Sequence, residues 1–331
     1  MTETVSPKMT EAGRFDLLAL LTRHATLVAL FALIVFNVFF TNHFLSMQTL
    51  NVNLTQVATI VIVGVGMTLV IATGGIDLSV GSMMAISGAI APLIFLGTAV
   101  KISEIHLAVA VGMITAVLVA GAFGWFNGWL ITRFRIQPII ATLVLFIAGR
   151  GIAQVSTNGN LQPFKLAQFQ WIGLGRWLGV PVQVVIMVAL VVIAAWVLRR
   201  SLFGRQILAI GGNERAARLA GIPVASVKRW VYCISGLCSG IAGLVVIAIN
   251  SSSDANLVGL GMELDAIAAV AVGGTLLSGG RATVTGTLIG ALIIQLVRYT
   301  LLANGVNDDV AKLVKAALIV LAVWLQRQGR S

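Results

Sequence analysis

Charged residues are scarce in this sequence. Only 10% of the 331 residues are Asp, Glu, Lys or Arg, whereas 58% are hydrophobic. An average soluble domain carries about 25% charged residues, so this composition excludes a soluble protein. Apolar runs of about 20 residues recur along the chain, which is the length needed to cross a hydrocarbon core of roughly 30 Å. We therefore predict an all-α polytopic membrane protein.

Residues with catalytic or metal-binding chemistry are also few. The chain has two cysteines and three histidines. Cys233 and Cys238 share one apolar segment and are expected to be small core residues rather than metal ligands or a disulfide. No HExxH, GxSxG or P-loop motif occurs, so we expect no enzyme activity and no metal or cofactor in this chain. ATP-driven transport would then require a separate ATPase subunit.

Ten membrane spans are predicted, in a single permease domain at 25–326. The short segments 1–24 and 327–331 flank this domain and are expected to be cytoplasmic. A large loop at 199–229 is expected on the same side. The predicted spans are 25–43, 52–72, 78–99, 106–131, 138–157, 181–198, 230–250, 264–279, 283–302 and 310–326.

The basic residues predict the orientation. The net charge of +11 does not indicate nucleic-acid binding here, because most of the lysines and arginines fall in alternate loops and mark them as cytoplasmic. An N-in, C-in topology collects on one side Lys8, Arg14, Arg23, Arg133, Arg135, Arg199, Arg200, Arg205, Arg215, Arg218, Lys228, Arg229, Arg281, Arg327 and Arg330.

The stretch TGGIDLSVGS interrupts the apolar sequence between the second and third spans. Gly74 and Gly75 can end a helix, and Asp77 with Ser79 can accept amide hydrogen bonds where the next helix begins. One role is a tight helix–turn–helix with an acidic cap. Another is a broken segment beside a translocation path, as transporters use discontinuous helices around cavities. The two roles are compatible.

A second glycine-rich break, VGGTLLSGGRATVTG, follows the eighth span. Its pattern resembles the first, with a glycine pair, an apolar residue, a serine and then a new helix. This similarity hints at an internal repeat, a common feature of transporters. The glycines that we expect to break the helix or act in gating are Gly273, Gly274, Gly279 and Gly280.

Two charged residues fall inside or beside predicted spans. Arg150 lies within a span, with Gln154 four residues on and hence on the same helix face. It is expected either to line a polar path or to lie near the outer interface and bind a carbonyl. Asp265 poses the same question. Its neighbour Glu263 is expected at the membrane surface.

The loop at 199–229 is the longest on the predicted cytoplasmic side. Asn213 is expected to cap a short helix at 214–220, which Gly221 and Pro223 then end. This helix either docks in a cleft of a partner or is a surface helix whose arginines only set the orientation.

Three segments together resemble a known family. GMTLVIATGGIDLSVGS, AIGGNERAARLAGI and ELDAIAAVAVGGTLLSGG are similar to the permease subunits of ribose-type monosaccharide ABC importers of bacteria. The resemblance covers about residues 45 to 325. Within the family, RIQPIIATLVLFIAGRGIAQ and SSDANLVGLGMELDAI most resemble the permease of the galactofuranose importer.

The resemblance implies a multi-pass protein of the bacterial inner membrane that carries a pentose or a furanose-form hexose by alternating access. It implies a second permease chain, a periplasmic sugar-binding protein that delivers sugar to the loops near 165–179 and 251–262, and a cytoplasmic ATPase that binds ATP and Mg²⁺. Its coupling segment, which docks on the ATPase, matches Gly212, Asn213, Ala216, Ala217, Gly221 and Ile222.

A sugar path needs groups that bind hydroxyls and carry little fixed charge. Besides Arg150, Gln154 and Asp265, the candidates are Asn127, Asn250 and Gln295. Asp77 is not expected to be a sugar ligand.

Three alternatives remain open. A branched-chain amino acid permease has similar hydropathy. An ion-coupled secondary transporter would need a carboxylate or histidine relay in mid-membrane, whereas the acids near spans all fall near predicted ends. A membrane scaffold or enzyme is disfavoured because no catalytic constellation occurs.

Overall fold

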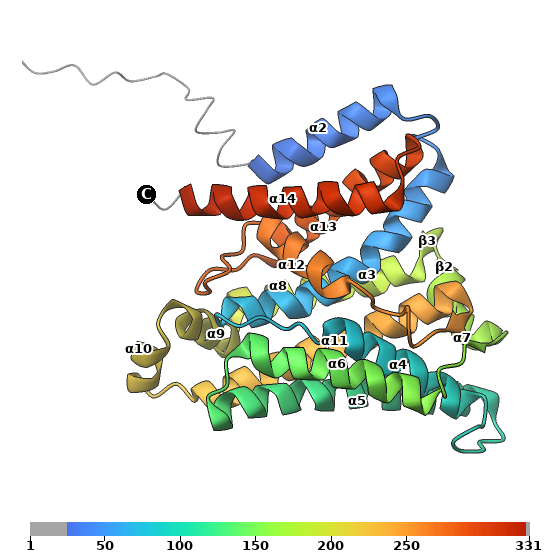
Figure 1. The fold of residues 1–331 in the computed structure, drawn as a ribbon, viewed down its shortest axis with the longest axis horizontal. Coiled ribbons are helices and arrows are strands. Elements are labelled where there is room, and N and C mark those ends of the chain that lie inside the picture. Colours follow the sequence, from blue (N-terminus) through green and yellow to red (C-terminus); the bar gives the residue numbers. More distant parts are fainter. Residues whose placement is uncertain (1–24, 329–331) are drawn as a thin grey trace, which may run out of the picture.

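The computed structural model describes residues 25–328, so the predicted cytoplasmic segment 1–24 and the last residues of the predicted tail 327–331 lie outside it. The described chain is a bundle of helices (Figure 1). The helices are α2 (Ala25–Phe40), α3 (Met47–Ala72), α4 (Val80–Phe95), α5 (Ile105–Phe134), α6 (Pro138–Ser156), α7 (Ala167–Leu174), α8 (Val182–Arg200), α9 (Leu202–Gly212), α10 (Glu214–Leu219), α11 (Val224–Asn250), α12 (Met262–Val272), α13 (Val284–Ala303) and α14 (Asp308–Gln328).

Each of the ten predicted spans corresponds to a helix. Among the residues that the structure describes, six helices are long and apolar enough to cross a bilayer, namely α3, α5, α6, α8, α11 and α13. The helices α2 and α4 have 16 residues and α12 has 11. At 1.5 Å per residue they reach about 24 and 17 Å, less than the roughly 30 Å of a hydrocarbon core. The predicted span 264–279 is therefore wrong at its end, because α12 stops at Val272.

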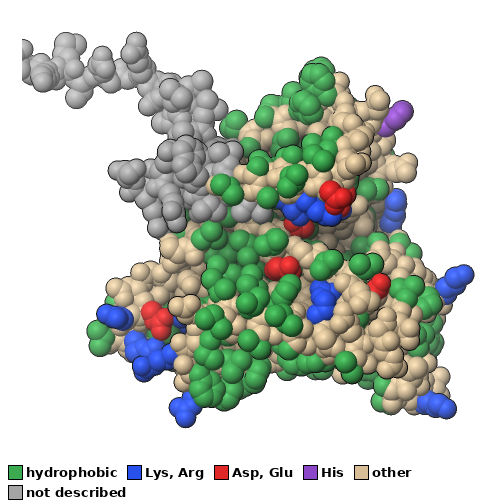
Figure 2. All heavy atoms as spheres, in the orientation of Figure 1, with side chains coloured by type: hydrophobic (Ala, Val, Ile, Leu, Met, Phe, Trp, Pro, Cys, Tyr) green, Lys and Arg blue, Asp and Glu red, His purple; other side chains and the backbone are tan. Residues whose placement is uncertain are grey.

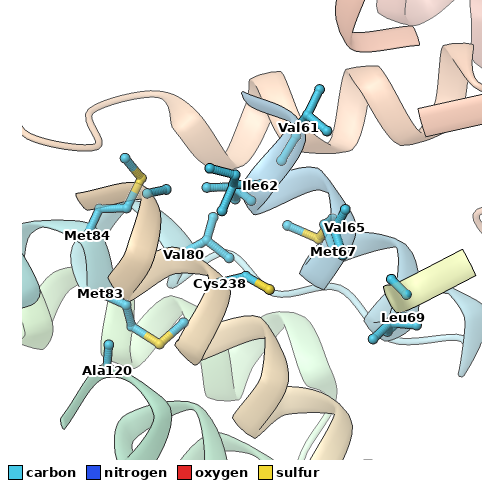
Figure 3. Close-up of a cluster of buried hydrophobic side chains, with 14 of the residues drawn as sticks. Val61, Ile62, Val65, Met67, Leu69, Val80, Met83, Met84, Ala120 and Cys238 are labelled. Atoms are coloured by element: carbon cyan, nitrogen blue, oxygen red, sulfur yellow. The ribbon is translucent and has the colours of Figure 1, made fainter. Parts of the chain in front are cut away.

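The helix α3 is the centre of the bundle. Every residue from Val57 to Ala72 is buried, and α3 packs on α8, α11, α12 and α13. Figure 3 shows its side chains Val61, Ile62, Val65 and Met67 among those of α4 and Cys238 of α11. A helix that is apolar all round must be enclosed by protein or lipid, and here protein encloses most of it.

The connections alternate between the two ends of the bundle. The turns after α3, α5 and α12 and the helices α9 and α10 lie at one end, on the left of Figure 1, together with the first described residues and the end of α14. The opposite end carries α7 and the short strands β1 (Gln162–Pro163), β2 (Arg176–Trp177), β3 (Val180–Pro181) and β4 (Ser252–Ser253). β1 pairs with β4 and β2 with β3, both antiparallel.

Candidate functional site

The first glycine-rich break ends α3 with a left-handed turn. Gly74 has φ +77°, a conformation that glycine adopts without strain. The amide of Gly74 donates to the carbonyl of Ile71 (2.8 Å), and that of Gly75 donates to the carbonyl of Val70 (3.2 Å). These two bonds form a Schellman cap. The predicted helix-ending role of this glycine pair is confirmed.

The chain then turns back into the bundle before α4 begins. In Figure 1 the segment 73–79 leads from the left end of α3 towards the centre of the molecule, where α4 starts. Ser235, which contacts this segment, lies eleven residues into α11, or about 17 Å from the start of that helix. Non-helical backbone inside a bundle of membrane helices is tolerated where protein surrounds it. Asp77 lies between the end of α3 at Ala72 and the start of α4 at Val80, as predicted, and the non-helical backbone around it agrees with the broken-segment interpretation.

Asp77 holds this segment together from the inside. Its carboxyl group is fully buried. One oxygen accepts the amide (3.0 Å) and the hydroxyl (2.5 Å) of Ser79, and the other accepts the hydroxyl of Ser235 on α11 (2.8 Å). Asn127 of α5 in turn donates to the hydroxyl oxygen of Ser79 (2.9 Å). Asp77 thus joins the break to α11, and Ser79, rather than Asp77, is the N-cap residue of α4.

The second break repeats the turn of the first. Gly274 has φ +82°. Its amide donates to Ala271 O (3.0 Å), and the amide of Thr275 donates to Val270 O (3.2 Å). This is the same Schellman cap. The similarity between the two sequence motifs therefore reflects the same local backbone structure at the ends of α3 and α12.

The two breaks meet the end of α9 at a junction of glycines. The amide of Gly280 donates to the carbonyl of Ala72 at 3.1 Å. A Cβ on Gly211 would lie only 1.9 Å from that carbonyl oxygen, and one on Gly279 would lie 2.7 Å from Gly74 N. Gly279 and Gly280 have φ of +87° and +80°. Only glycine allows three backbones to approach so closely. The sequence did not single out Gly211.

The predicted cap of α10 is confirmed. The side chain of Asn213 accepts the amide of Ala216 at 3.0 Å, and Gly221, with φ +80°, follows the helix. Glu214 forms ion pairs with Lys228 (2.7 Å) and Arg218 (3.1 Å). The hydrogen bond from Lys228 is the main cause that holds the pKa of the Glu214 carboxyl below its usual value. α10 is thereby tied to the start of α11.

The surface of α10 differs from what the coupling motif suggests. Ala217 is buried against the body of the protein, whereas Ala216 is exposed and Gly212 and Gly221 have open space around them. Leu219 is 91% exposed beside Ala216 on the outer side of α10, and it was not among the residues selected from the sequence.

A second irregular segment enters the bundle from the opposite end. Residues 254–261 lead from β4 to the start of α12 (Figure 1). A Cβ on Gly259 would lie 2.3 Å from the carbonyl oxygen of Gly81 in α4. The two irregular segments, 73–79 and 254–261, thus approach each other where α4 begins. Glu263 is 7% exposed and so packs against protein, and its expected position at the level of the membrane surface stays a prediction.

Arg150 fixes the entering segment. Its Nη1 donates to the carbonyls of Ala255 (2.9 Å), Asn256 (3.2 Å) and Val258 (3.0 Å), and its Nη2 contacts Gly81 O at 3.5 Å. Of the two predicted roles, binding to carbonyls describes this contact. Gln154, one turn along, donates to the side chain of Asn256 at 2.8 Å.

Replacing Arg150 by Ala is expected to loosen residues 254–261. Leaving partly buried carbonyls without donors costs about 2 kcal/mol, or roughly a 30-fold rise in local opening. Amide hydrogen exchange of this segment in the purified protein measures the change. Gln154→Ala is the matched control, since it removes one exposed bond on the same helix face and should change exchange less than threefold. Equal effects would show that Arg150 has no special role in holding the segment.

The remaining path candidates do not share one surface. Gln295 is buried and donates to Gln56 Oε1 at 2.7 Å, beside a cavity between α2, α3 and α13. Asp265 pairs with Lys315 of α14. Asn250 is exposed at the end of α11, and Asn127 is buried in the Asp77 cluster. The structure therefore brings Arg150 and Gln154 together at Asn256, pairs Asp265 with Lys315, and separates Asn127, Asn250 and Gln295 from them.

The chain matches, over residues 49–323, the family described as branched-chain amino acid transport system / permease component. It is 40% identical to the ribose import permease protein of Escherichia coli strain K12 over 99% of both chains. The galactofuranose transporter permease protein of the same strain is also 40% identical, over 83% of this chain and 78% of that one. The L-arabinose ABC transporter permease protein of Azospirillum brasilense is 34% identical over 87% and 82%. No solved structure matches.

The chain therefore belongs to this family of permease components, and its full-length similarity is to the ribose-type permeases. The resemblance read from the three sequence motifs is confirmed. Identity does not favour the galactofuranose permease over the ribose permease, since both values are 40%.

Proposed function

We propose that this chain is the membrane-spanning subunit of an ABC importer that carries a monosaccharide across the bacterial inner membrane by alternating access. The names of the relatives that match over most of their length support a monosaccharide as the transported substrate. The observation that carries the mechanism is the glycine junction, because it joins the end of α9, next to α10, to the ends of α3 and α12. A push on α10 is therefore transmitted directly to both helix breaks.

A cytoplasmic ATPase that binds ATP and Mg²⁺ is the proposed partner of α10. Its closure would move α10 as a rigid body, since the Asn213 cap stabilises this short helix and the Glu214–Lys228 ion pair holds it to α11. In this proposal α9, α10 and both described chain ends lie on the cytoplasmic side, and the excess of arginine in this region supports that orientation.

The opposite end is the proposed docking site of a sugar-binding protein. β1 pairs with β4, and Gln170 of α7 donates to Ser251 Oγ at 2.7 Å, so the two predicted outer loops form one surface. This surface continues through residues 254–261 to Arg150. A bound receptor can thus act on the segment that touches the start of α4.

A second permease chain is proposed to cover the face between α6 and α14. Figure 2 shows acidic and basic side chains on this otherwise apolar face. Arg150, Gln154 and the Asp265–Lys315 pair belong to α6, α12 and α14, and none of the four is fully buried. Charged groups at membrane depth are stable only against protein or water, so this face is better suited to a polar path between two chains than to lipid.

The position of Asp77 bears on the ion-coupled alternative. An ion-coupled transporter would need a buried carboxylate, and both Asp77 and Glu263 are buried within the bundle. Their predicted positions near the ends of spans are therefore not by themselves an argument against ion coupling. Asp77, however, is enclosed by its hydroxyl donors, and the family membership supports an ABC system.

Sugar-stimulated ATP hydrolysis tests the proposal. Liposomes would contain this chain, its co-expressed ATPase and a binding protein loaded with different monosaccharides or with leucine. We expect stimulation by one monosaccharide. Stimulation by leucine alone would establish the amino acid permease, which the family's description favours. Uptake driven by an ion gradient without hydrolysis would establish the secondary transporter.

Leu219→Asp is expected to abolish the stimulation. A charge placed in an apolar docking surface typically costs about 2 kcal/mol or more, enough to lower affinity at least 30-fold. Co-purification of the ATPase measures the loss directly. Leu178→Asp is the matched control, since Leu178 is 90% exposed at the opposite end and should leave co-purification unchanged. Ala217 is a poor test position because it is buried. Retention of the ATPase by Leu219→Asp would show that this leucine lies outside the docking surface.

A further inference from the structure

A basic cavity lies beside α10, at the proposed cytoplasmic end. Its volume is about 810 Å³, and it opens between the α5–α6 connection and the helices α10 and α11. Its charged lining consists of Arg133, Arg135, Arg215, Arg218, Lys228 and Glu214. Figure 2 shows the blue side chains gathered around a red one at this end of the molecule.

The only acid among the residues that line this cavity is already neutralised. Glu214 is shared between Lys228 and Arg218. Within residues 25–328, no carboxylate lies within ion-pair distance of Arg133, Arg135 or Arg215. Three unpaired guanidinium groups therefore face one cavity, and their mutual repulsion favours an anion that several of them can contact. Guanidinium binds phosphate with two parallel hydrogen bonds.

The surroundings favour a lipid as the source of that anion. Ile131, Ile136 and Pro138 also line the cavity. Next to it, Phe134 is 58% exposed and Ile139 is 49% exposed. Exposed apolar and aromatic side chains beside arginines at helix ends are typical of the level where a bilayer ends. A headgroup could enter the cavity while its acyl chains remain against Ile139 and the outer face of α6.

We propose that this cavity binds the phosphate headgroup of an anionic phospholipid, and that the bound lipid holds α10 against the α5–α6 connection. Arg135 belongs to the connection and Arg215 to α10, so one phosphate that contacts both would bridge them. The position of α10 would then depend on anionic lipid, whichever substrate the protein carries.

Lipid binding to the purified full-length chain tests the proposal. Native mass spectrometry would measure binding of phosphatidylglycerol, with phosphatidylcholine, whose phosphate is balanced by its own choline cation, as the net-neutral comparison. Each basic side chain near an anionic lipid contributes about fivefold in affinity. The triple variant Arg133→Gln, Arg135→Gln, Arg215→Gln is therefore expected to lose about 100-fold in phosphatidylglycerol affinity and to keep its phosphatidylcholine affinity.

The matched control removes three exposed arginines from the same end but outside the cavity, as Arg199→Gln, Arg200→Gln, Arg205→Gln. It should change phosphatidylglycerol affinity less than threefold. An equal loss of phosphatidylglycerol affinity in both variants would show that the arginines act only as nonspecific surface charge, and it would overturn the proposal. Displacement of the lipid by millimolar inorganic phosphate would show a site for a free anion and also overturn it.

A third outcome concerns the ATPase. If the cavity variant released the ATPase in nanodiscs of phosphatidylcholine alone, while the wild type retained it, the cavity would be receiving an acidic segment of the ATPase rather than a lipid. The expected result is the opposite: equal retention in phosphatidylcholine, and a gain in coupled hydrolysis on adding phosphatidylglycerol that only the wild type and the control variant show.

Discussion

Gly211→Ala is expected to abolish coupled transport. The added methyl group would lie 1.9 Å from Ala72 O and 2.4 Å from Gly280 N. Both are backbone atoms, so neither can move aside by changing a rotamer. Overpacking of this kind costs about 3 kcal/mol or forces the backbones apart. Separation at this point would break the Gly280–Ala72 hydrogen bond, which links the two helix breaks.

Gly212→Ala is the matched control, one residue further along the same helix. A Cβ there meets nothing within 4 Å, and alanine favours a helix over glycine by about 1 kcal/mol. Thermal unfolding in detergent should therefore show a lower midpoint for Gly211→Ala and an equal or higher one for Gly212→Ala. ATPase co-purification and sugar-stimulated hydrolysis then compare Gly211→Ala with the wild type alone, because Gly212 itself belongs to the predicted coupling segment. If Gly211→Ala were as stable and active as the wild type, the junction would not transmit motion.

The positions of the helices could be predicted because hydrophobicity sets them. Each apolar run in the sequence became a helix, and the least regular of them, around Arg150, is continuous from Pro138 to Ser156. The lengths of α4 and α12 could not be predicted. The predicted spans ran past the observed ends of these helices at Phe95 and Val272, because apolar residues continue beyond both ends, whereas Gly97 and Gly274 adopt positive φ and stop the helices there.

Residues of the candidate site could be predicted where their structural role depends on residues close to them in the sequence. The glycine pair that ends α3 and the Asn213 cap depend on neighbouring residues, and both were found. Ser235, Gly211 and Lys315 were missed because their partners lie far away in the sequence. A lysine in the tenth predicted span was a usable signal, since a membrane-buried charge needs a counter-charge, but the sequence alone does not identify Asp265 as that partner.

Asp77→Asn is expected to destabilise the protein by about 3 kcal/mol, because hydrogen bonds to a buried charged group contribute about 1.5–3 kcal/mol each and a donor left unpaired costs a similar amount. Three donors, the amide and hydroxyl of Ser79 and the hydroxyl of Ser235, converge on the two carboxyl oxygens. Asparagine keeps the shape but replaces one oxygen with an NH₂ group, which cannot accept. One donor must therefore lose its partner in a site without solvent. Asp254→Asn is the control, since Asp254 accepts only from Asn256 in an exposed turn.

A double-mutant cycle separates a structural role of Asp77 from a direct role in transport. If Asp77 acts by holding the break to α11, Ser235→Ala alone should cost about 1.5 kcal/mol and should cost much less when Asp77→Asn is already present, because the bond that it removes is then already weakened. Thermal unfolding and sugar uptake should fall together across the series. A variant Asp77→Asn with wild-type stability but no uptake would show instead that the carboxyl group takes part in transport itself. The enclosed position of the group argues against that outcome, since no substrate or ion reaches Asp77 unless the segment 73–79 first moves.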